Sequence, residues 1–390
     1  MSLLNTNRIS VSASADTKME QELPDIPLVD LKQQVFELED EIHLAIQQVV
    51  DRCDFILGKA VAEFESAFAA WTGVRHAVGV ASGLDALTLS LSALGVTAGD
   101  EVIVPVNTFT ATAMAVVAAG AKPVFVDCDP DSYLMNLKHL DSVVTSATRA
   151  IIPVHLTGQP ADMESVIRFA ERFSLAVVED AAQAHGARYQ GIACGAFGNA
   201  GCFSFYPGKN LGGFGDGGMI TTNDERLASK LRCLRNYGQR QKYEHVLAGT
   251  NSRLDTIQAA VLNVKLPRMD DWNLQRATKA ALYREGLKDV GDLVIQAPLP
   301  NRTHVYHLFI IETEDRDGLL QHLNSGGIQA AIHYPVPLHL QPAYSHLGYK
   351  KGDFPEAERL AGRVLSLPMF PQMTEAQVDR VCQRVCSWFS

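Results

Sequence analysis

Residues Phe203 to Asn210 read F-S-F-Y-P-G-K-N, an apolar run that ends in a single lysine, Lys209. A strand that leads into such a glycine-containing turn places the amine at the mouth of a sheet. An amine in that position can form a Schiff base with an aldehyde, or it can be an ordinary solvated loop lysine. Other chemistry-bearing residues along the chain are needed to choose between these alternatives.

Two glycine motifs near Lys209 resemble nucleotide-binding loops but lack the required context. Between Gly201 and the G-K pair there are six residues instead of the four of a P-loop, and an asparagine replaces its Ser or Thr. Gly213, Gly215 and Gly218 fit G-x-G-x-x-G, but the strand-like residues 219–222 follow where a dinucleotide site needs a helix. We therefore interpret neither motif as a nucleotide site.

Composition indicates a globular chain without a nucleic-acid or membrane partner. The chain has 390 residues, of which 47% are hydrophobic and 20% charged, enough for a large core and two domains. Its net charge of −10 opposes non-specific nucleic-acid binding, and we find no signal peptide or apolar run of membrane length. The odd number of cysteines, seven, favours a reducing cytoplasmic location, and Cys382 and Cys386 lack the companions of a metal site.

The first part of the chain alternates strands and helices. Residues 1–24 are polar and non-periodic and predict a disordered tail, whereas apolar residues at three- and four-residue steps from Leu31 to Val49 predict an amphipathic helix. A second helix is expected over residues 61–71. The pattern predicts an α/β fold with a mainly parallel sheet. Strands are expected at Ala77–Ala81, Val102–Val104, Pro123–Val126, Ile151–Val154, Leu175–Val178, Cys202–Phe205 and Met219–Thr222, the last two pairing directly.

After residue 250 the pattern changes to long helices followed by a smaller α+β unit. We accordingly divide the chain into a tail (1–24), a large α/β domain (25–250) and a C-terminal α+β domain (251–390). The C-terminal domain is expected to contain helices at Arg253–Val264, Asp270–Leu287 and Glu375–Trp388 and strands at Tyr306–Ile311 and Gln329–Ile332.

Ligands of parallel sheets bind at the carboxyl ends of the strands, so the residues that follow each strand are informative. Ser82 and Gly83 open a predicted helix, whose free N–H groups and positive dipole end can hold a phosphate. Phe109 lies at the next strand-to-helix turn, where its ring can stack on a planar cofactor or pack in the core.

Asp180 follows the strand 175–178 and places an acid at the same edge. A buried carboxylate needs a partner, and a protonated pyridinium nitrogen is a natural one, although an acid that caps a helix is the alternative. The lysine, the acid, the phosphate turn and the aromatic ring together favour pyridoxal 5′-phosphate (PLP) as cofactor.

From about residue 26 to its end, the chain resembles the DegT/DnrJ/StrS-type sugar aminotransferases, PLP enzymes of the aspartate-aminotransferase fold (fold type I). The resemblance implies that Lys209 carries the cofactor as a Schiff base and that Asp180 pairs with the pyridine nitrogen. It further implies that Gln183 bonds the 3-hydroxyl group and that Phe109 stacks on the ring. Ser204, Ser82 and Gly83 match the family's phosphate-binding residues.

Three details refine the resemblance. Asn251, in G-T-N-S-R-L-D, is similar to the asparagine that reaches the neighbouring subunit's phosphate, which implies a homodimer with shared active sites. Leu84 stands where relatives usually carry threonine after the glycine, so Ser82 is expected to substitute for the missing hydroxyl. Relatives with histidine in place of the lysine are dehydratases, and Lys209 places this chain with the aminotransferases.

By the same resemblance, L-glutamate is the amino donor and a nucleotide-linked keto-sugar is the acceptor. The H-Y-P-V-P-L-H stretch, with His333, Tyr334 and His339, resembles the subgroup that aminates carbon 3 and supplies candidate substrate residues. A proline-stiffened turn with partly buried imidazoles is the structural alternative. Amination at carbon 4, a PLP-dependent dehydratase or lyase, and a non-enzymatic PLP-binding regulator remain open alternatives, as do the nucleotide and the sugar.

Overall fold

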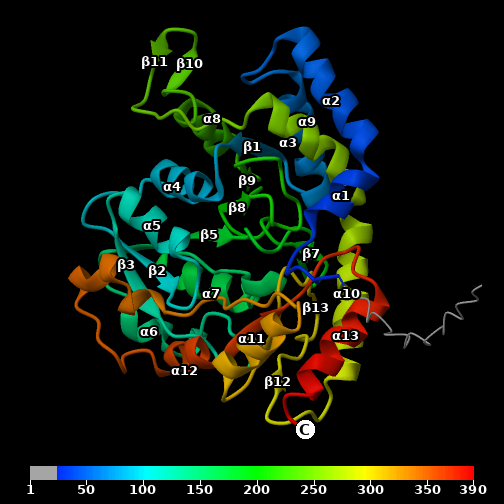
Figure 1. Ribbon diagram of the computed structural model, residues 1–390. Coiled ribbons are helices and arrows are strands. Elements are labelled where there is room, and N and C mark those ends of the chain that lie inside the picture. The colour runs from blue at the N-terminus through cyan, green and yellow to red at the C-terminus, as the bar shows by residue number, and fades with distance from the viewer. Residues whose placement is uncertain (1–23) are drawn as a thin grey trace, which may run out of the picture.

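A seven-stranded sheet forms the centre of the computed structural model, which describes residues 24–390 (Figure 1). The strand order is β1-β9-β8-β5-β4-β2-β3, and every neighbouring pair is parallel except the two that involve β9. The predicted α/β fold with a mainly parallel sheet is confirmed, whereas the predicted tail lies outside the described residues apart from Pro24. The strands are β1 (His76–Val80), β2 (Glu101–Pro105), β3 (Lys122–Val126), β4 (Thr148–Ile151), β5 (Ala176–Asp180), β8 (Ala200–Ser204) and β9 (Gly218–Thr222).

Strands β8 and β9 pair directly, as predicted, and run antiparallel from Gly201↔Thr221 to Ser204↔Gly218. Because the other strands are parallel to β8, the end of β8 and the start of β9 meet the carboxyl ends of β1, β2 and β5 at one edge. This edge is where the sequence placed its chemistry-bearing residues.

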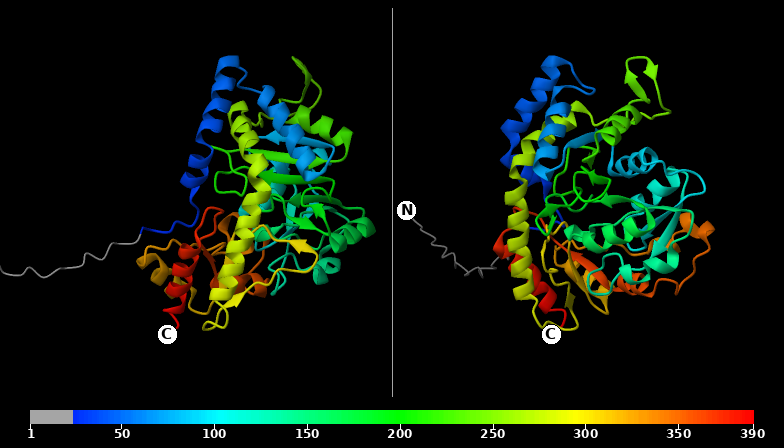
Figure 2. Two further views of the ribbon diagram at one scale, coloured as in Figure 1. Left: turned by 90° about the vertical axis from the view of Figure 1, so that its right-hand side faces the viewer. Right: turned by 180° about the vertical axis from the view of Figure 1, so that it is seen from behind.

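Helices cover both faces of the sheet (Figures 1 and 2). The predicted first helix is split, because Leu38 leaves helical geometry (φ −120°, ψ 14°), and this bend leaves both Leu38 and Ile42 buried. The helices of this part are α1 (Leu31–Glu37), α2 (Glu39–Arg52), α3 (Lys59–Thr72), α4 (Gly83–Ala93), α5 (Thr110–Ala118), α6 (Leu140–Val143), α7 (Met163–Phe173), α8 (Glu225–Leu234) and α9 (Thr256–Lys265). None of the helices in residues 24–390 is long and apolar enough to span a membrane.

The C-terminal unit is built on a small antiparallel sheet of order β12-β14-β15. Long helix α10 runs down to it along one side of the molecule (Figure 2). The unit contains β12 (Val294–Ile295), β14 (Phe309–Glu312), β15 (Val364–Leu367), α10 (Met269–Gly286), α11 (Arg316–Ser325), α12 (Pro355–Arg363) and α13 (Glu375–Cys386). A further small sheet joins β13 (Arg302–Thr303) to β6 (Arg188–Tyr189) and β7 (Ile192–Ala193), and a separate hairpin of β10 (Gln239–Gln241) and β11 (Glu244–His245) lies beside α8, away from the C-terminal unit (Figure 1).

Two strand predictions in this unit need correction. The strand expected from Tyr306 begins only at Phe309, because Tyr306 has a positive φ of 43° and the preceding chain turns towards residues 157–158. Residues 329–332 form no strand. Only Ala331 pairs with β15, while Ile328 pairs with Ile26, so no continuous ladder can form.

Helices that follow the predicted domain boundary at residue 250 share a core with helices that precede it. Leu254, Leu262 and Trp272 are buried in the same core as Phe64 on α3, so α9 and the start of α10 pack with the large domain. At the other end, Ile26 joins the core of the C-terminal unit. Helix α10 is long enough to contribute to both cores, with Trp272 in the first and Tyr283 in the second.

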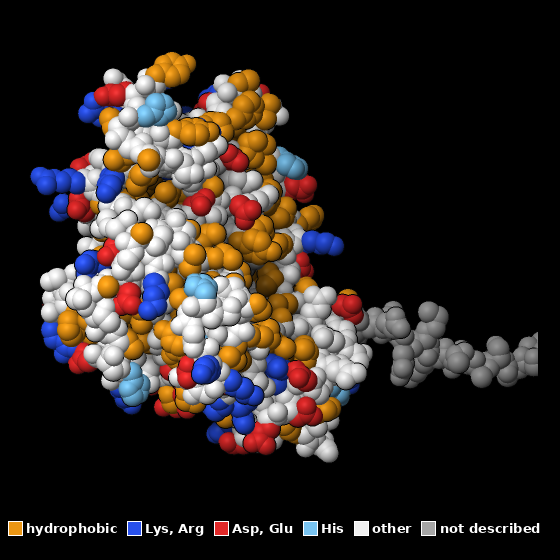
Figure 3. Space-filling view, turned by 90° about the vertical axis from the view of Figure 1, so that its left-hand side faces the viewer, with side chains coloured by type: hydrophobic (Ala, Val, Ile, Leu, Met, Phe, Trp, Pro, Cys, Tyr) orange, Lys and Arg blue, Asp and Glu red, His pale blue; other side chains and the backbone are white. Residues whose placement is uncertain are grey.

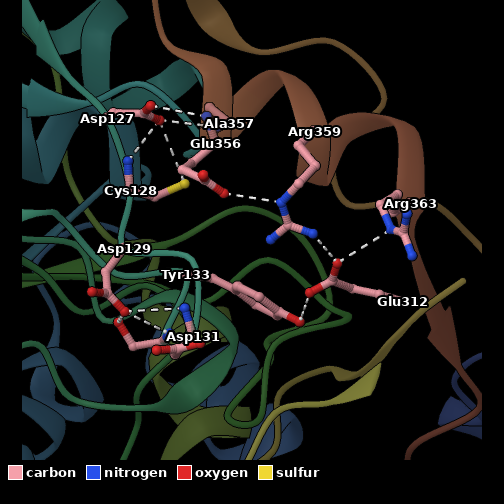
Figure 4. Close-up of polar contacts among 11 residues, drawn as sticks. Asp127, Cys128, Asp129, Asp131, Tyr133, Glu312, Glu356, Ala357, Arg359 and Arg363 are labelled. Carbon is pink, nitrogen blue, oxygen red and sulfur yellow. Dashed lines mark hydrogen bonds and ion pairs between the residues drawn. The ribbon is translucent and has the colours of Figure 1, made fainter. Parts of the chain in front are cut away.

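A buried polar cluster joins the two units (Figure 4). The Tyr133 hydroxyl, from the loop after β3, donates to Glu312 at the end of β14 (2.5 Å), and Arg359 of α12 also binds this carboxylate (2.5 Å). Asp127 accepts hydrogen bonds from the first N–H groups of α12, those of Glu356 (3.0 Å) and Ala357 (2.9 Å). Burial and the Glu312 carboxylate raise the pKa of Tyr133, which therefore stays a donor. The cluster fixes the C-terminal unit against the sheet.

Replacing Tyr133 by phenylalanine removes one donor from the buried Glu312 carboxylate. We expect Tyr133→Phe to lower the free energy of unfolding by about 1 to 3 kcal/mol, the cost of an unsatisfied buried polar group. Denaturant titration measures this change. Tyr243→Phe is the matched control, because Tyr243 is 82% exposed and should stay within about 0.5 kcal/mol of the parent. Equal stability of the two variants would contradict the role of the cluster.

Candidate functional site

Four of the predicted residues lie at the carboxyl edge of the main sheet. Two of them follow a strand, and two occupy the last position of a strand. Ser82 follows β1, Phe109 follows β2, and Asp180 and Ser204 end β5 and β8. The register aligns Asp180 with Cys202, two residues before Ser204. The fold therefore brings to one edge residues that are up to 122 positions apart in the sequence (82 to 204).

Lys209 lies in the turn that leaves β8, where its N–H donates to the carbonyl of Tyr206 (2.8 Å). The side chain is partly buried, and this burial lowers the pKa of the amine to about 8, although the negative charge of Asp180 acts in the opposite direction. An amine with this pKa is largely unprotonated only at mildly alkaline pH, but even near neutral pH far more of it is unprotonated than of an ordinary lysine, so it can act as a nucleophile and as a base.

Asp180 is buried, and its carboxylate is held from two sides. The Thr112 hydroxyl donates to Oδ2 (2.8 Å) and the Ala182 N–H to Oδ1 (3.2 Å), and Thr108 in turn contacts the Thr112 hydroxyl (2.9 Å). Of residues 107–112, only Phe109 was predicted to belong to the site. The signal for Thr112 was its place in the first turn of α5, one helical turn after Thr108, which directs it to the same edge.

The turn after β1 is packed too tightly for any residue but glycine. A Cβ atom on Gly83 would lie 2.7 Å from the Cβ of Ser204, and one on Gly218 would lie 2.3 Å from the carbonyl oxygen of Ser82. Ser82 caps α4 by accepting from the Asp85 N–H (3.0 Å). The cradle thus combines a helix N-terminus with the hydroxyl groups of Ser82 and Ser204, a suitable set of donors for a phosphate.

Gln183 is clamped in one orientation. Its amide oxygen accepts from the Thr157 N–H (2.6 Å), so its amide nitrogen faces the Tyr334 hydroxyl (3.2 Å). Thr157 adopts a positive φ of 62°, and no sequence signal marks a threonine for that conformation. The clamp leaves Gln183 as a hydrogen-bond donor towards the site.

Tyr334 and His333 reach the site from the C-terminal unit. The Tyr334 ring lies 5.6 Å from that of Phe109, which is 53% exposed, so the Phe109 ring is free to stack on a planar group. His333 is held through Nδ1 by the Ser366 hydroxyl (2.8 Å). Burial and the charge of Lys209 lower the pKa of His333 to about 4, which keeps the imidazole neutral.

Two predicted residues do not join this group. His339 is buried against Phe354 and pairs through Nε2 with Glu358 (2.9 Å), a placement that favours the structural alternative. Asn251 is exposed and pairs with Asn236 at the molecular surface. Its neighbour Ser252, which the sequence analysis did not select, reaches the phosphate turn by accepting from the Ala81 N–H (3.2 Å).

These residues fit PLP. The cradle of Gly83 and Ser204 accommodates a phosphate, Asp180 offers a buried carboxylate, Phe109 offers an uncovered ring, and Lys209 offers an amine of lowered pKa. All but Phe109 and Gln183 have the chemistry of charged or anion-binding groups, so an apolar ligand would not match the site.

Comparisons with known proteins agree with this geometry. A relative from Streptomyces venezuelae, "dTDP-3-amino-3,4,6-trideoxy-alpha-D-glucose transaminase", is 48% identical over 94% of this chain and 97% of its own length. A second relative, the "Pleiotropic regulatory protein" of Geobacillus stearothermophilus, is 46% identical over 93% of this chain and 98% of its own.

A solved structure and a family model also match this chain. The crystal structure of S. venezuelae DesV in complex with a ketimine intermediate superposes with a TM-score of 0.93 at 47% identity, covering 94% of this chain and 99% of DesV. The model of the DegT/DnrJ/EryC1/StrS aminotransferase family matches residues 37–386. The chain therefore belongs to the DegT/DnrJ/EryC1/StrS aminotransferase family.

Proposed function

We propose that the protein is a PLP-dependent aminotransferase that moves an amino group from L-glutamate to carbon 3 of a nucleotide-linked keto-sugar. The observation that carries the proposal is the amine of Lys209, whose pKa is lowered to about 8, at the same sheet edge as the buried Asp180 and the phosphate cradle. Membership of an aminotransferase family supports the reaction type.

Each residue of the site has a distinct task in this reaction. Bound PLP supplies an electron sink for a carbanion at the donor's α-carbon. Lys209 anchors the cofactor and, once displaced by the donor, takes the α-proton, which its lowered pKa permits. Asp180, oriented by Thr112, provides a negative charge that stabilises a protonated ring nitrogen. Gln183, fixed by Thr157, donates towards an oxygen on the ring.

The acceptor position is supported by two observations. The S. venezuelae relative carries in its name a sugar with the amino group at carbon 3, and the H-Y-P stretch of this chain resembles that subgroup. His333, neutral and fixed by Ser366, is available to accept a hydrogen bond from a sugar hydroxyl. The nucleotide and the remaining sugar substituents stay undetermined.

A second copy of the chain completes the site in this proposal. Figure 3 shows hydrophobic side chains gathered on one face of the molecule, a feature that can mark a protein–protein contact. Tyr206 and Phe214 flank the Lys209 turn and are 59% and 43% exposed, and Phe55 and Ile56 of the turn after α2 are 43% and 50% exposed. Exposed aromatic rings beside the lysine are suited to contact with a partner subunit. In such a dimer, Asn251 of each chain would reach the phosphate site of the other chain.

Product analysis tests the reaction. Incubation with L-glutamate should convert the bound cofactor in the absence of any sugar, and a panel of nucleotide-linked 3-keto and 4-keto sugars should then yield one amino-sugar. Nuclear magnetic resonance of the product should place its nitrogen at carbon 3. Nitrogen at carbon 4 would refute the position alone, and release of ammonia would indicate a lyase. Failure of the glutamate step would favour a regulatory role such as that named for the G. stearothermophilus relative.

Subunit mixing tests the shared site. Asn251→Ala and Lys209→Ala should each be impaired alone, but hybrids contain one site in which both residues are intact. After exchange, activity should therefore recover to about a quarter of the wild-type value, because half of the dimers are hybrids with one competent site each. No recovery, despite exchange demonstrated by differently tagged chains, would mean that Asn251 serves the site of its own chain.

A further inference from the structure

The glycine run that follows Lys209 is shaped by a side chain of helix α9. The Cβ atom of a larger residue would lie 2.9 Å from Gln258 Oε1 at position 213 and 3.0 Å from Gln258 Nε2 at position 215. Gln258 Oε1 also accepts from the N–H of Phe214 (2.7 Å). The G-x-G spacing that resembled a dinucleotide motif thus leaves room for Gln258.

Lys265, seven residues further along α9, holds the same loop from the same side of the helix. Its ammonium donates to the carbonyl of Gly212 (2.8 Å) and to the side chain of Gln34 on α1 (3.1 Å), and it lies 4.9 Å from the ring centre of Phe214. Helix α9 therefore contacts three consecutive loop residues, at positions 212, 213 and 214, through two side chains.

The position of Lys265 is costly. Only 2% of the residue is exposed, and among residues 24–390 no carboxylate lies within ion-pair distance of its ammonium. Burial lowers its pKa to about 8. A protein with a buried cation that lacks an ionic partner is usually less stable than one with an apolar residue of the same size at that position. Core packing therefore gives no reason for a lysine here.

Lys265 is connected to Lys209 through a short stretch of backbone, because it contacts Gly212, three residues after Lys209. A Cβ on Gly212 would lie 2.2 Å from the carbonyl oxygen of Pro207, so the loop folds back tightly across the Lys209 turn. Directly after Lys209, the side-chain amide of Asn210 is buried and donates to Asn273 and to the carbonyl of Val305 (both 3.0 Å). Lys265 and Gln258 anchor the loop beyond Asn210, where it returns towards β9.

We propose that Lys265, together with Gln258, is a positioning residue for Lys209, which fixes the lysine turn to α9 so that the amine keeps its orientation towards a bound cofactor. The inference rests on the proposed function for the role of Lys209. Helix α9 also begins four residues after Ser252, which contacts the phosphate turn through Ala81 and Asp85. One helix thereby sets the position of both the phosphate turn and the lysine turn.

Lys265→Met tests the proposal with a side chain of similar size that donates no hydrogen bond. In the cofactor-free protein, hydrogen–deuterium exchange of residues 210–217 should become faster by about tenfold or more, the loss expected for roughly one hydrogen bond to a charged group. In the protein loaded with PLP, the pH midpoint of the long-wavelength absorbance band should shift. The value of kcat/KM should fall roughly ten- to a hundredfold, as displacement of a reacting group predicts.

Gln34→Leu is the matched control, because it removes the other acceptor of Lys265 and leaves the bond to Gly212 in place. We expect a lower melting temperature but unchanged exchange of residues 210–217 and an unchanged pH midpoint. Should Lys265→Met not fold, Lys265→Leu, which also donates no hydrogen bond, takes its place with the same readouts. Unchanged exchange and an unchanged midpoint in a folded Lys265 variant would overturn the proposal. The exchange measurement needs neither donor nor sugar. Its outcome therefore tests the positioning role whether or not the proposed reaction is correct.

Discussion

The removal of Lys209 from water, next to the negative charge of Asp180, is the constraint on which the rest of the site depends. Burial favours the neutral amine and Asp180 favours the ammonium, and burial is the larger effect. If Asp180 prevailed, the amine would stay protonated and could neither bond to an aldehyde nor take a proton. The balance requires a sheet edge that partly shields the lysine from solvent and holds the carboxylate in place, and the hydrogen bond from Thr112 supplies part of that restraint.

The surrounding structure maintains this balance from two sides. The C-terminal unit brings His333 and Tyr334 to the site, and the Tyr133–Glu312 contact fixes that unit against the sheet. The neutral state of His333 matters here, because a second cation would lower the pKa of Lys209 further. On the other side, helix α9 contacts the loop that follows the lysine turn through Gln258 and Lys265.

The sequence predicted what depends on local pattern and failed where tertiary contacts decide. Strand positions and the order of residues after strands located Lys209, Asp180, Ser82 and Ser204, because carboxyl ends of parallel strands share one edge. The pattern gave no means of finding Thr157, whose role depends on an unusual backbone conformation. The contacts of His339 and the burial of Lys265 each involve a segment distant in the sequence, and the pattern did not show that one helix, α10, contributes to two cores.

The pKa of Lys209 in the cofactor-free protein tests this account most directly. It can be measured from the pH dependence of the rate at which PLP bonds to the amine, since only the unprotonated amine reacts. The account predicts that this rate rises with pH and levels off above a midpoint of about 8. It also predicts a lower midpoint in Asp180→Asn, which loses the charge that stabilises the ammonium. A midpoint near the ordinary value of 10.5, or one that Asp180→Asn does not lower, would contradict it.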